Sequence, residues 1–338
     1  MKKLFIPILF LILTLTSCEL FYEEVTYNKI NMITIGLDYS NTYQLYWSPR
    51  SNSYEEYDFS LDATINDATD VEASFEDLSN NRDIDITYTG YSYLQEGASY
   101  SSETISDEFY PSKEHIITAL ENLSDISDDN TINIIYYSGH GTYDVYDSFT
   151  TYDYDGAWVL ATTDTDTGES DFSTEDQLLS IEQIYELLED VEGYTVIISD
   201  SCYSGNFYQD SEYSLSEDDF SLSAALEKLF SSGSDDSSIF FISASSNDES
   251  SYEFPDGWNS RLHGVFTYAL LEGLGWDDDE LKITEDIPPA VEDGILSLDS
   301  IVSYIDENLD YEYFDYYDLD SQELQTSGWR YDLVLFEY

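Results

Sequence analysis

Short apolar runs rich in β-branched and aromatic residues alternate along the chain with stretches whose apolar residues recur every three or four positions. Runs of the first kind predict buried strands, and stretches of the second kind predict helices packed on a sheet. The predicted strands are 30–37, 84–88, 132–137, 158–160, 194–199, 239–243 and 333–336, and the predicted helices are 61–78, 111–123, 180–188, 222–230, 265–274 and 297–309. Strands separated by helices in this order predict an α/β fold with a mainly parallel sheet and helices on both faces.

Two polar segments interrupt this alternation. Residues 40–59 are polar and rich in tyrosine, and we expect a long loop there. Residues 142–179 are acidic and punctuated by glycine around the strand-like 158–160. Because no internal repeat and no linker composition is evident, we expect one domain over residues 30–338.

The first eighteen residues have the layout of a secretory signal. Lys2 and Lys3 precede an apolar stretch over 4–15, which is too short to span a membrane. The following Leu15-Thr16-Ser17-Cys18 resembles the lipobox of bacterial lipoproteins. That resemblance implies removal of 1–17, acylation of Cys18, a tether over 18–29, and a protein exported to the bacterial cell envelope and held on a membrane by its lipid anchor. An ordinary cleaved signal with a chance cysteine is the alternative.

The chain is strongly acidic, with 72 Asp and Glu against 10 Lys and Arg and a formal net charge of -62. Nucleic acid and anionic lipid headgroups are repelled by such a charge. It is compatible with attraction of cationic peptides, with binding of divalent cations, or with solubility alone, and solubility is the interpretation we favour.

Two reactive side chains follow two of the predicted strands. His140 lies in Ser138-Gly139-His140-Gly141, and Cys202 follows Asp200-Ser201 after the strand 194–199. Since the carboxyl ends of parallel strands share one edge of a sheet, we expect the thiol and the imidazole to meet there. A nearby base would activate the thiol, and the backbone N–H groups of Gly141 and Cys202 are the expected oxyanion hole. The acidic surroundings favour a protonated His140 and an ion pair sensitive to salt.

These motifs resemble the two catalytic motifs of the caspase family in its bacterial, metacaspase-like branch. The segments 33–37, 65–68, 243–245 and 264–271 resemble further parts of that family. The resemblance implies a caspase-like three-layer sandwich and a cysteine endopeptidase, with Cys202 as nucleophile and His140 as base. The alternatives are a catalytically idle caspase-fold lipoprotein that acts as a binding module, or a turn histidine and a small core cysteine.

Asp200 carries the expected specificity. Metacaspases resemble this chain in placing aspartate two residues before the cysteine, and a carboxylate there favours Arg or Lys at the cleavage site of a polypeptide substrate. We expect Arg50 to lie at the surface and His115 and His263 to be structural. The acidic stretches 153–156 and 164–168 contain fragments of a calcium loop without the full ligand pattern, so we assign no metal and no cofactor.

Overall fold

The computed structural model of the 338-residue chain describes the part that carries the sheet and its helices. The described residues are 27–40, 43–48, 53–80, 86–97, 102–142, 156–163, 176–201, 238–245, 251–254, 260–309, 314, 322, 324–327 and 333–338. Cys18, Arg50, Cys202, the predicted helix 222–230 and nearly all of the two calcium-loop fragments lie outside these residues.

A six-stranded sheet forms the centre of the molecule, with strand order β14-β10-β9-β5-β1-β4. Its five longer strands run parallel, and β14 pairs antiparallel with β10 at one edge. The elements in chain order are β1 (Lys29–Leu37), β2 (Tyr43–Ser48), β3 (Ser53–Asp58), α2 (Thr64–Asn80), β4 (Thr87–Gln95), α3 (Ser102–Ile105), α4 (Lys113–Ile126), β5 (Thr131–Ser138), β6 (Gly141–Thr142), β7 (Ala157–Val159), β8 (Leu178–Ser180), α5 (Ile181–Leu188), β9 (Tyr194–Asp200), β10 (Ile239–Ser243), α7 (Val265–Leu274), β11 (Trp276–Asp277), β12 (Lys282–Ile283), β13 (Ile295–Ser297), α8 (Leu298–Asn308), β14 (Gln325–Ser327) and β15 (Val334–Glu337).

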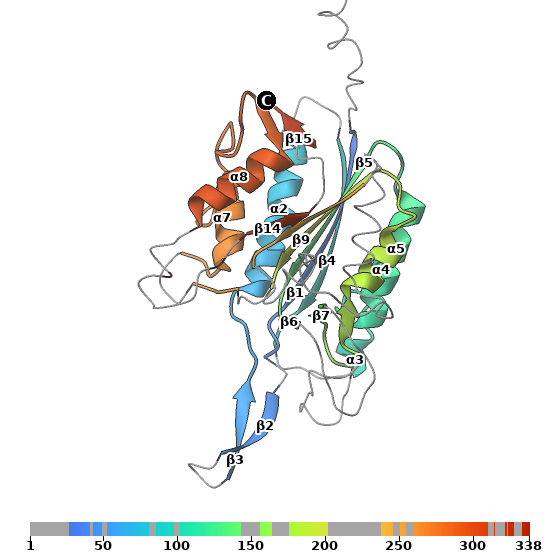
Figure 1. The fold of residues 1–338 in the computed structure, drawn as a ribbon, viewed down its shortest axis with the longest axis vertical. Helices are drawn as coiled ribbons and strands as arrows, with labels where there is room; N and C mark the ends of the chain where they lie inside the picture. Colours follow the sequence, from blue (N-terminus) through green and yellow to red (C-terminus); the bar gives the residue numbers. More distant parts are fainter. Residues whose placement is uncertain are drawn as a thin grey trace, which may run out of the picture.

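Helices cover both faces of this sheet, as Figure 1 shows: α2, α7 and α8 lie on one side, and α4 and α5 on the other. The pleat of the strands explains the two cores, because successive side chains point to opposite faces. Along β5, Ile134 and Tyr136 join the core under α2 and α7, whereas Ile135 and Tyr137 join the core under α4 and α5. The predicted α/β three-layer sandwich is therefore confirmed.

Sequence periodicity located most of these elements. Serine N-caps begin three helices: Ser112 begins α4, Ser180 begins α5 with a complete capping box, and Ser297 begins α8. In each case the serine side chain accepts a hydrogen bond from a backbone N–H of the first turn, which is the reason that such residues mark helix starts.

The predicted loop over 40–59 is wrong. It contains the antiparallel hairpin of β2 and β3, which projects from the body of the molecule in Figure 1. Tyrosine and tryptophan favour strands, which accounts for β2 and β3 in a segment that is otherwise polar.

Two further predictions on strands need correction. The strand predicted at 84–88 corresponds to β4, which extends to Gln95. The apolar pattern did not reveal this extent, because β4 is a half-exposed edge strand with few apolar residues. The last strand, β15, is present but pairs with β13 outside the main sheet.

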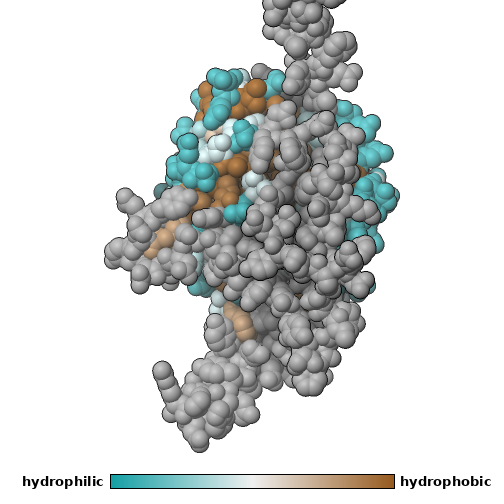
Figure 2. Space-filling view, viewed as in Figure 1, coloured by the Kyte–Doolittle hydropathy of each residue, from teal (hydrophilic) through white to brown (hydrophobic). Residues whose placement is uncertain are grey.

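The surface of the described part agrees with the acidic composition. Figure 2 shows hydrophilic residues along the side where α4 and α5 face solvent, and Glu114, Glu121 and Asp125 are exposed on α4. Among the helices in the described ranges, none combines the length and apolar character that crossing a bilayer requires.

Candidate active site

The strands β5 and β9 end together at one edge of the sheet. Ser138 pairs with Asp200 in the parallel register, and the N–H of Gly139 donates to the carbonyl of Asp200 over 3.2 Å. His140 and Cys202 each follow this pair by two residues in the sequence. In this segment the described residues end at Ser201, one residue before Cys202. The predicted contact between the Cys202 thiol and the His140 imidazole therefore stays a prediction.

The imidazole of His140 is held by a backbone carbonyl that sequence reasoning did not identify. Its Nε2 lies 2.7 Å from the oxygen of Phe59, which accepts the hydrogen bond, so in neutral His140 the proton sits on Nε2 and the lone pair on Nδ1. Burial lowers the pKa of His140, while the Phe59 carbonyl acts in the opposite direction. Within the described residues, burial thus favours the neutral form of His140, while the expected ion pair with the Cys202 thiolate stays a prediction.

A buried tyrosine holds the backbone of this loop. The Tyr39 hydroxyl accepts from the N–H of His140 over 2.9 Å and donates to the carbonyl of Val159 over 2.5 Å. Its ring packs against the imidazole with 4.6 Å between ring centroids. The Tyr137 hydroxyl donates to the carbonyl of His140 over 2.6 Å. The backbone of His140 is thus fixed by Tyr39, which follows β1, and by Tyr137 of β5, and its ring packs against Tyr39.

The register of β6 and β7 indicates which way the backbone amide of Gly141 points. In an antiparallel pair, hydrogen-bonded and non-hydrogen-bonded residue pairs alternate. Because the carbonyl of His140 accepts from Val159, the next pair, Gly141 with Trp158, is of the non-hydrogen-bonded type. The N–H of Gly141 consequently points away from β7.

A pocket beside His140 is lined by carboxylates from three separate parts of the chain. Asp200 comes from the end of β9, Asp67 from the first turn of α2, and Glu253 from the segment 251–254. The complete lining consists of Leu61, Thr64, Asp67, Ser138, Gly139, His140, Asp200, Ser201, Ser251, Tyr252, Glu253 and Gly264. The structure therefore brings His140 and Asp200 together at one site, as the sequence predicts.

Each carboxylate in the pocket is fixed by hydrogen bonds. Asp200 Oδ1 accepts from the Ser251 hydroxyl over 2.5 Å, and Oδ2 accepts from the hydroxyl and the N–H of Thr267 over 2.6 and 3.3 Å. Asp67 Oδ2 accepts from the Ser138 hydroxyl over 2.9 Å. Such bonds orient the carboxylates, so the pocket is organised before any ligand enters.

Burial, more than the proximity of the acids to one another, raises the pKa of two of them. Burial, with the charge of Asp67 as a second cause, raises the pKa of Asp200 to about 7, against the hydrogen bonds from Ser251 and Thr267. Burial likewise raises the pKa of Glu253 to about 7, against bonds from two backbone N–H groups. A cationic group in this pocket would stabilise the ionised forms and reverse these shifts.

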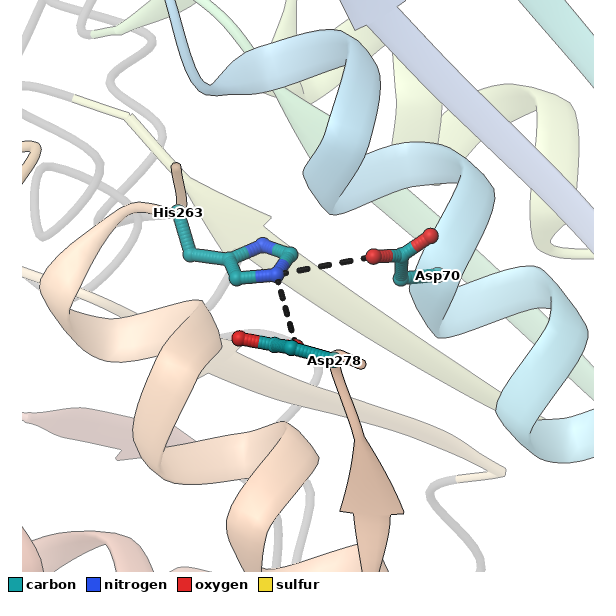
Figure 3. Close-up of side chains that lie close together, drawn as sticks. All are labelled: Asp70, His263 and Asp278. Carbon is teal, nitrogen blue, oxygen red and sulfur yellow. Dashed lines mark hydrogen bonds and ion pairs between the residues drawn. The ribbon is translucent and has the colours of Figure 1, made fainter. Parts of the chain in front are cut away.

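A second cluster lies directly behind Asp67 and has the donor atoms of a metal site. The imidazole of His263 sits between Asp70 of α2 and Asp278, which follows β11 (Figure 3), and the three candidate ligand atoms lie within 4.8 Å of one another. However, the Nε of Arg261 is 2.6 Å from Asp70 Oδ2, the oxygen that a metal would bind. Burial alone would lower the pKa of His263, but its hydrogen bonds to Asp278 and Asp67 raise it to about 9. We therefore interpret the cluster as a buried network of ion pairs.

Sequence reasoning missed Asp67, Glu253 and the connection to His263. One signal for Asp67 was present: it occupies the apolar stripe of α2 together with Val71 and Phe75 at spacings of four, and a carboxylate on a buried stripe needs a partner. No comparable pattern marks Glu253. The prediction that His263 is merely structural is incomplete, because its ring contacts Asp67 of the pocket.

Comparison with known proteins supports this interpretation of the fold. The family model described as "Caspase domain" matches residues 51–292. Among solved structures, the crystal structure of protein GSU0716 from Geobacter sulfurreducens is similar with 16% identity and a TM-score of 0.47, covering 89% of this chain and 94% of that one. Among curated proteins the comparison finds no match. The family model alone carries the assignment, and it matches most of the chain: this protein belongs to the caspase family.

Proposed function

We propose that this caspase-family protein is a cysteine endopeptidase that cleaves polypeptides after arginine or lysine, with Cys202 as nucleophile and His140 as base. The family is one of cysteine peptidases in general. The observation that carries the finer proposal is the convergence of Asp67, Asp200 and Glu253 on a pocket whose wall includes His140.

The chemistry follows from the state of His140. As a neutral base, Nδ1 takes the proton of the Cys202 thiol, and the thiolate attacks the scissile carbonyl carbon. The N–H groups of Gly141 and Cys202 bind the developing oxyanion. The imidazolium then protonates the leaving amine as the C–N bond breaks, and water hydrolyses the resulting thioester to regenerate the thiol. The Phe59 carbonyl stabilises the imidazolium that exists between these two proton transfers.

The preference for basic residues follows from charge. An ammonium or guanidinium group between ionised Asp67 and Asp200 would form charge-assisted hydrogen bonds, which are about twice as strong as neutral ones. An acidic side chain in the same position would meet like charges without a compensating cation, because the described lining residues include no lysine or arginine.

Peptides that differ only in the residue before the cleavage site test this proposal. We expect the purified chain without its first 17 residues to release aminomethylcoumarin from an arginine-ended peptide at least about a hundred times faster than from the aspartate-ended analogue, since like charges in a desolvated pocket cost several kcal/mol. Cys202→Ala should abolish both activities. Absence of cleavage by the wild-type protein would instead favour a caspase fold kept for binding, and faster cleavage after aspartate would disprove the assignment of the pocket.

We further propose that Cys18 anchors the protein to a membrane of the bacterial envelope. The support is the lipobox-like Leu15-Thr16-Ser17-Cys18 after an apolar stretch. We expect the wild-type protein to sediment with membranes and to partition into detergent, and Cys18→Ser to be retained as an unprocessed precursor that carries no lipid. Mass spectrometry of the N-terminal peptide measures the difference. A processed wild-type protein with an unmodified Cys18 would contradict the proposal.

A further inference from the structure

His263 is the most deeply buried histidine of the described residues and lies outside the pocket lining, yet it contacts the pocket through one residue. Its Nδ1 is 2.8 Å from Asp67 Oδ1, and its side chain is 0% exposed. The mechanism above does not use it. Its position between the pocket and the acidic groups behind it therefore requires an explanation.

Both ring nitrogens of His263 face carboxylate oxygens. On the far side from Asp67, Nε2 lies 3.3 Å from Asp278 Oδ1 and 3.5 Å from Asp70 Oδ2, and Figure 3 shows the same nitrogen directed at both. A neutral imidazole has a proton on one nitrogen alone, so it would set a lone pair against a carboxylate on one side. The geometry thus favours the doubly protonated imidazolium, which donates on both sides.

Asp67 is the residue through which this charge acts on the pocket. Its Oδ1 accepts from His263 and from the N–H of Gly264, while its Oδ2 accepts from Ser138 at the pocket wall. Asp67 and Asp200 are like charges that both approach Gly264 at the position a Cβ would occupy, so the absence of a side chain leaves room for both carboxylates. Without a cation behind Asp67, mutual repulsion would cause one of the two to take up a proton.

We propose that His263 is a positioning residue whose imidazolium orients the carboxylate of Asp67 and balances its charge, and thereby sets the affinity of the pocket for a cationic side chain. This inference rests on the proposed specificity for basic residues. It identifies a determinant of that specificity that no substrate atom touches.

The charges around His263 are consistent with this role. Asp67 and Asp70 face it from α2, and Asp278 faces it from the turn after β11. Arg261 is paired with Asp70 and so offsets that charge. Because Arg261 pairs with Asp70, the cation among the described residues that balances the charge of Asp67 is the imidazolium of His263. Raising the pH through the pKa of His263, about 9, removes that cation and should weaken the pocket.

Direct titration tests the charge of His263 without any enzymatic activity. The sequence has three histidines, so imidazole NMR signals of the Cys202→Ala protein, purified without a histidine tag and assigned with His115→Asn and His263→Asn, are readily resolved. We expect His263 to titrate above pH 8 and Asp67→Asn to lower its pKa by at least about one unit. Titration of His263 near 6.5 or below in the folded protein would overturn the proposal.

Binding of agmatine, a small guanidinium compound, tests the effect on the pocket. We expect His263→Asn to weaken agmatine binding to the Cys202→Ala protein about tenfold, with no further weakening once Asp67 is already asparagine, because contacting residues are non-additive. His115→Asn is the control for loss of a remote histidine. If His263→Asn fails to fold, Asp278→Asn, which removes one partner of the ring, should weaken binding to a smaller extent.

The outcomes separate the two proposals. Additive losses from the His263 and Asp67 substitutions would disprove positioning through Asp67 even in an active peptidase. Agmatine binding that depends on both residues, in a protein that cleaves no peptide, would support the positioning role and reject the proposed catalysis. Absence of agmatine binding to the parent protein would overturn the proposal together with the assigned specificity.

Discussion

Replacing Asp200 by asparagine is expected to lower kcat/KM for arginine-ended peptides by about 10²- to 10³-fold, because removing one partner of a buried charge pair typically costs 2–5 kcal/mol. The side chain lies at the end of β9, is 5% exposed, and lines the pocket that includes His140. Peptides ending in citrulline, a neutral analogue of arginine, show whether charge is the cause. The wild-type enzyme should discriminate strongly against citrulline, and the variant should discriminate little.

The same substitution is expected to stabilise the fold at alkaline pH. Burial, together with the charge of Asp67, raises the pKa of Asp200 from 3.8 to about 7, so the folded protein binds more protons than the unfolded chain between these values. Stability of the wild-type protein therefore falls as the pH rises through this window. The free energy of unfolding of Asp200→Asn should exceed that of the wild type by about 1–3 kcal/mol at pH 8 and by little at pH 4.

Denaturant unfolding at several pH values measures this difference. Asp190→Asn is a matched control, because Asp190 is exposed in the loop before β9 and its neutralisation reproduces the change in net charge alone. A constant difference between Asp200→Asn and the wild type from pH 4 to pH 8 would contradict the raised pKa. Undiminished cleavage after arginine would contradict the role of Asp200 in specificity.

The expected loss of activity and the expected gain of stability in Asp200→Asn have one cause. A pocket that binds a desolvated cation must hold carboxylates near one another in a site with little water, and the empty pocket is then electrostatically unfavourable. Asp200 and Glu253 are both shifted in this sense. These carboxylates lower the stability of the free protein, and binding of a cationic side chain would offset that loss. Binding sites commonly lower stability in this way.

Hydrophobic pattern was sufficient to predict the sheet, its helices and the edge at which the site lies. The buried strands β5 and β9 contain the apolar runs 134–137 and 196–198, so the residues near their carboxyl ends, His140 and Asp200, were assigned to the same edge. The hairpin of β2 and β3 was not predicted, because its tyrosines occur among polar residues that are equally typical of a loop.

The acidic pocket was predicted only in part. Asp200 was identified, but Asp67 and Glu253 come from parts of the sequence that are far from Asp200. His263 and Asp67 are 196 residues apart in sequence, and Glu253 reaches the pocket from a segment without regular secondary structure. Local patterns report which face of an element is buried, but they do not report which buried carboxylate faces another. Phe59 was missed for a further reason: it contributes a backbone carbonyl, which any residue type supplies.

Gly264→Ala is expected to damage the pocket from the side of the helix α7. A Cβ on Gly264 would lie 2.3 Å from Asp200 Oδ2 and 3.3 Å from Asp67 Oδ2, so both carboxylates would have to move. The backbone itself accepts alanine, since Gly264 has a φ of -60°. We expect the free energy of unfolding to fall by about 1–3 kcal/mol, the typical cost of overpacking, and cleavage after arginine to be lost with it.

A second substitution distinguishes this clash from an effect on the helix start, because Gly264 is also the N-cap of α7 and alanine is a poorer N-cap by less than about 1 kcal/mol. Asp200→Ala removes the oxygen that the new methyl group would strike. We therefore expect Gly264→Ala to cost less stability in the Asp200→Ala background than in the wild-type background, while cleavage after arginine stays absent because the carboxylate is missing. If Gly264→Ala costs the same in both backgrounds, the loss originates at the start of α7, and the close approach of Gly264 to the pocket carboxylates does not explain the glycine.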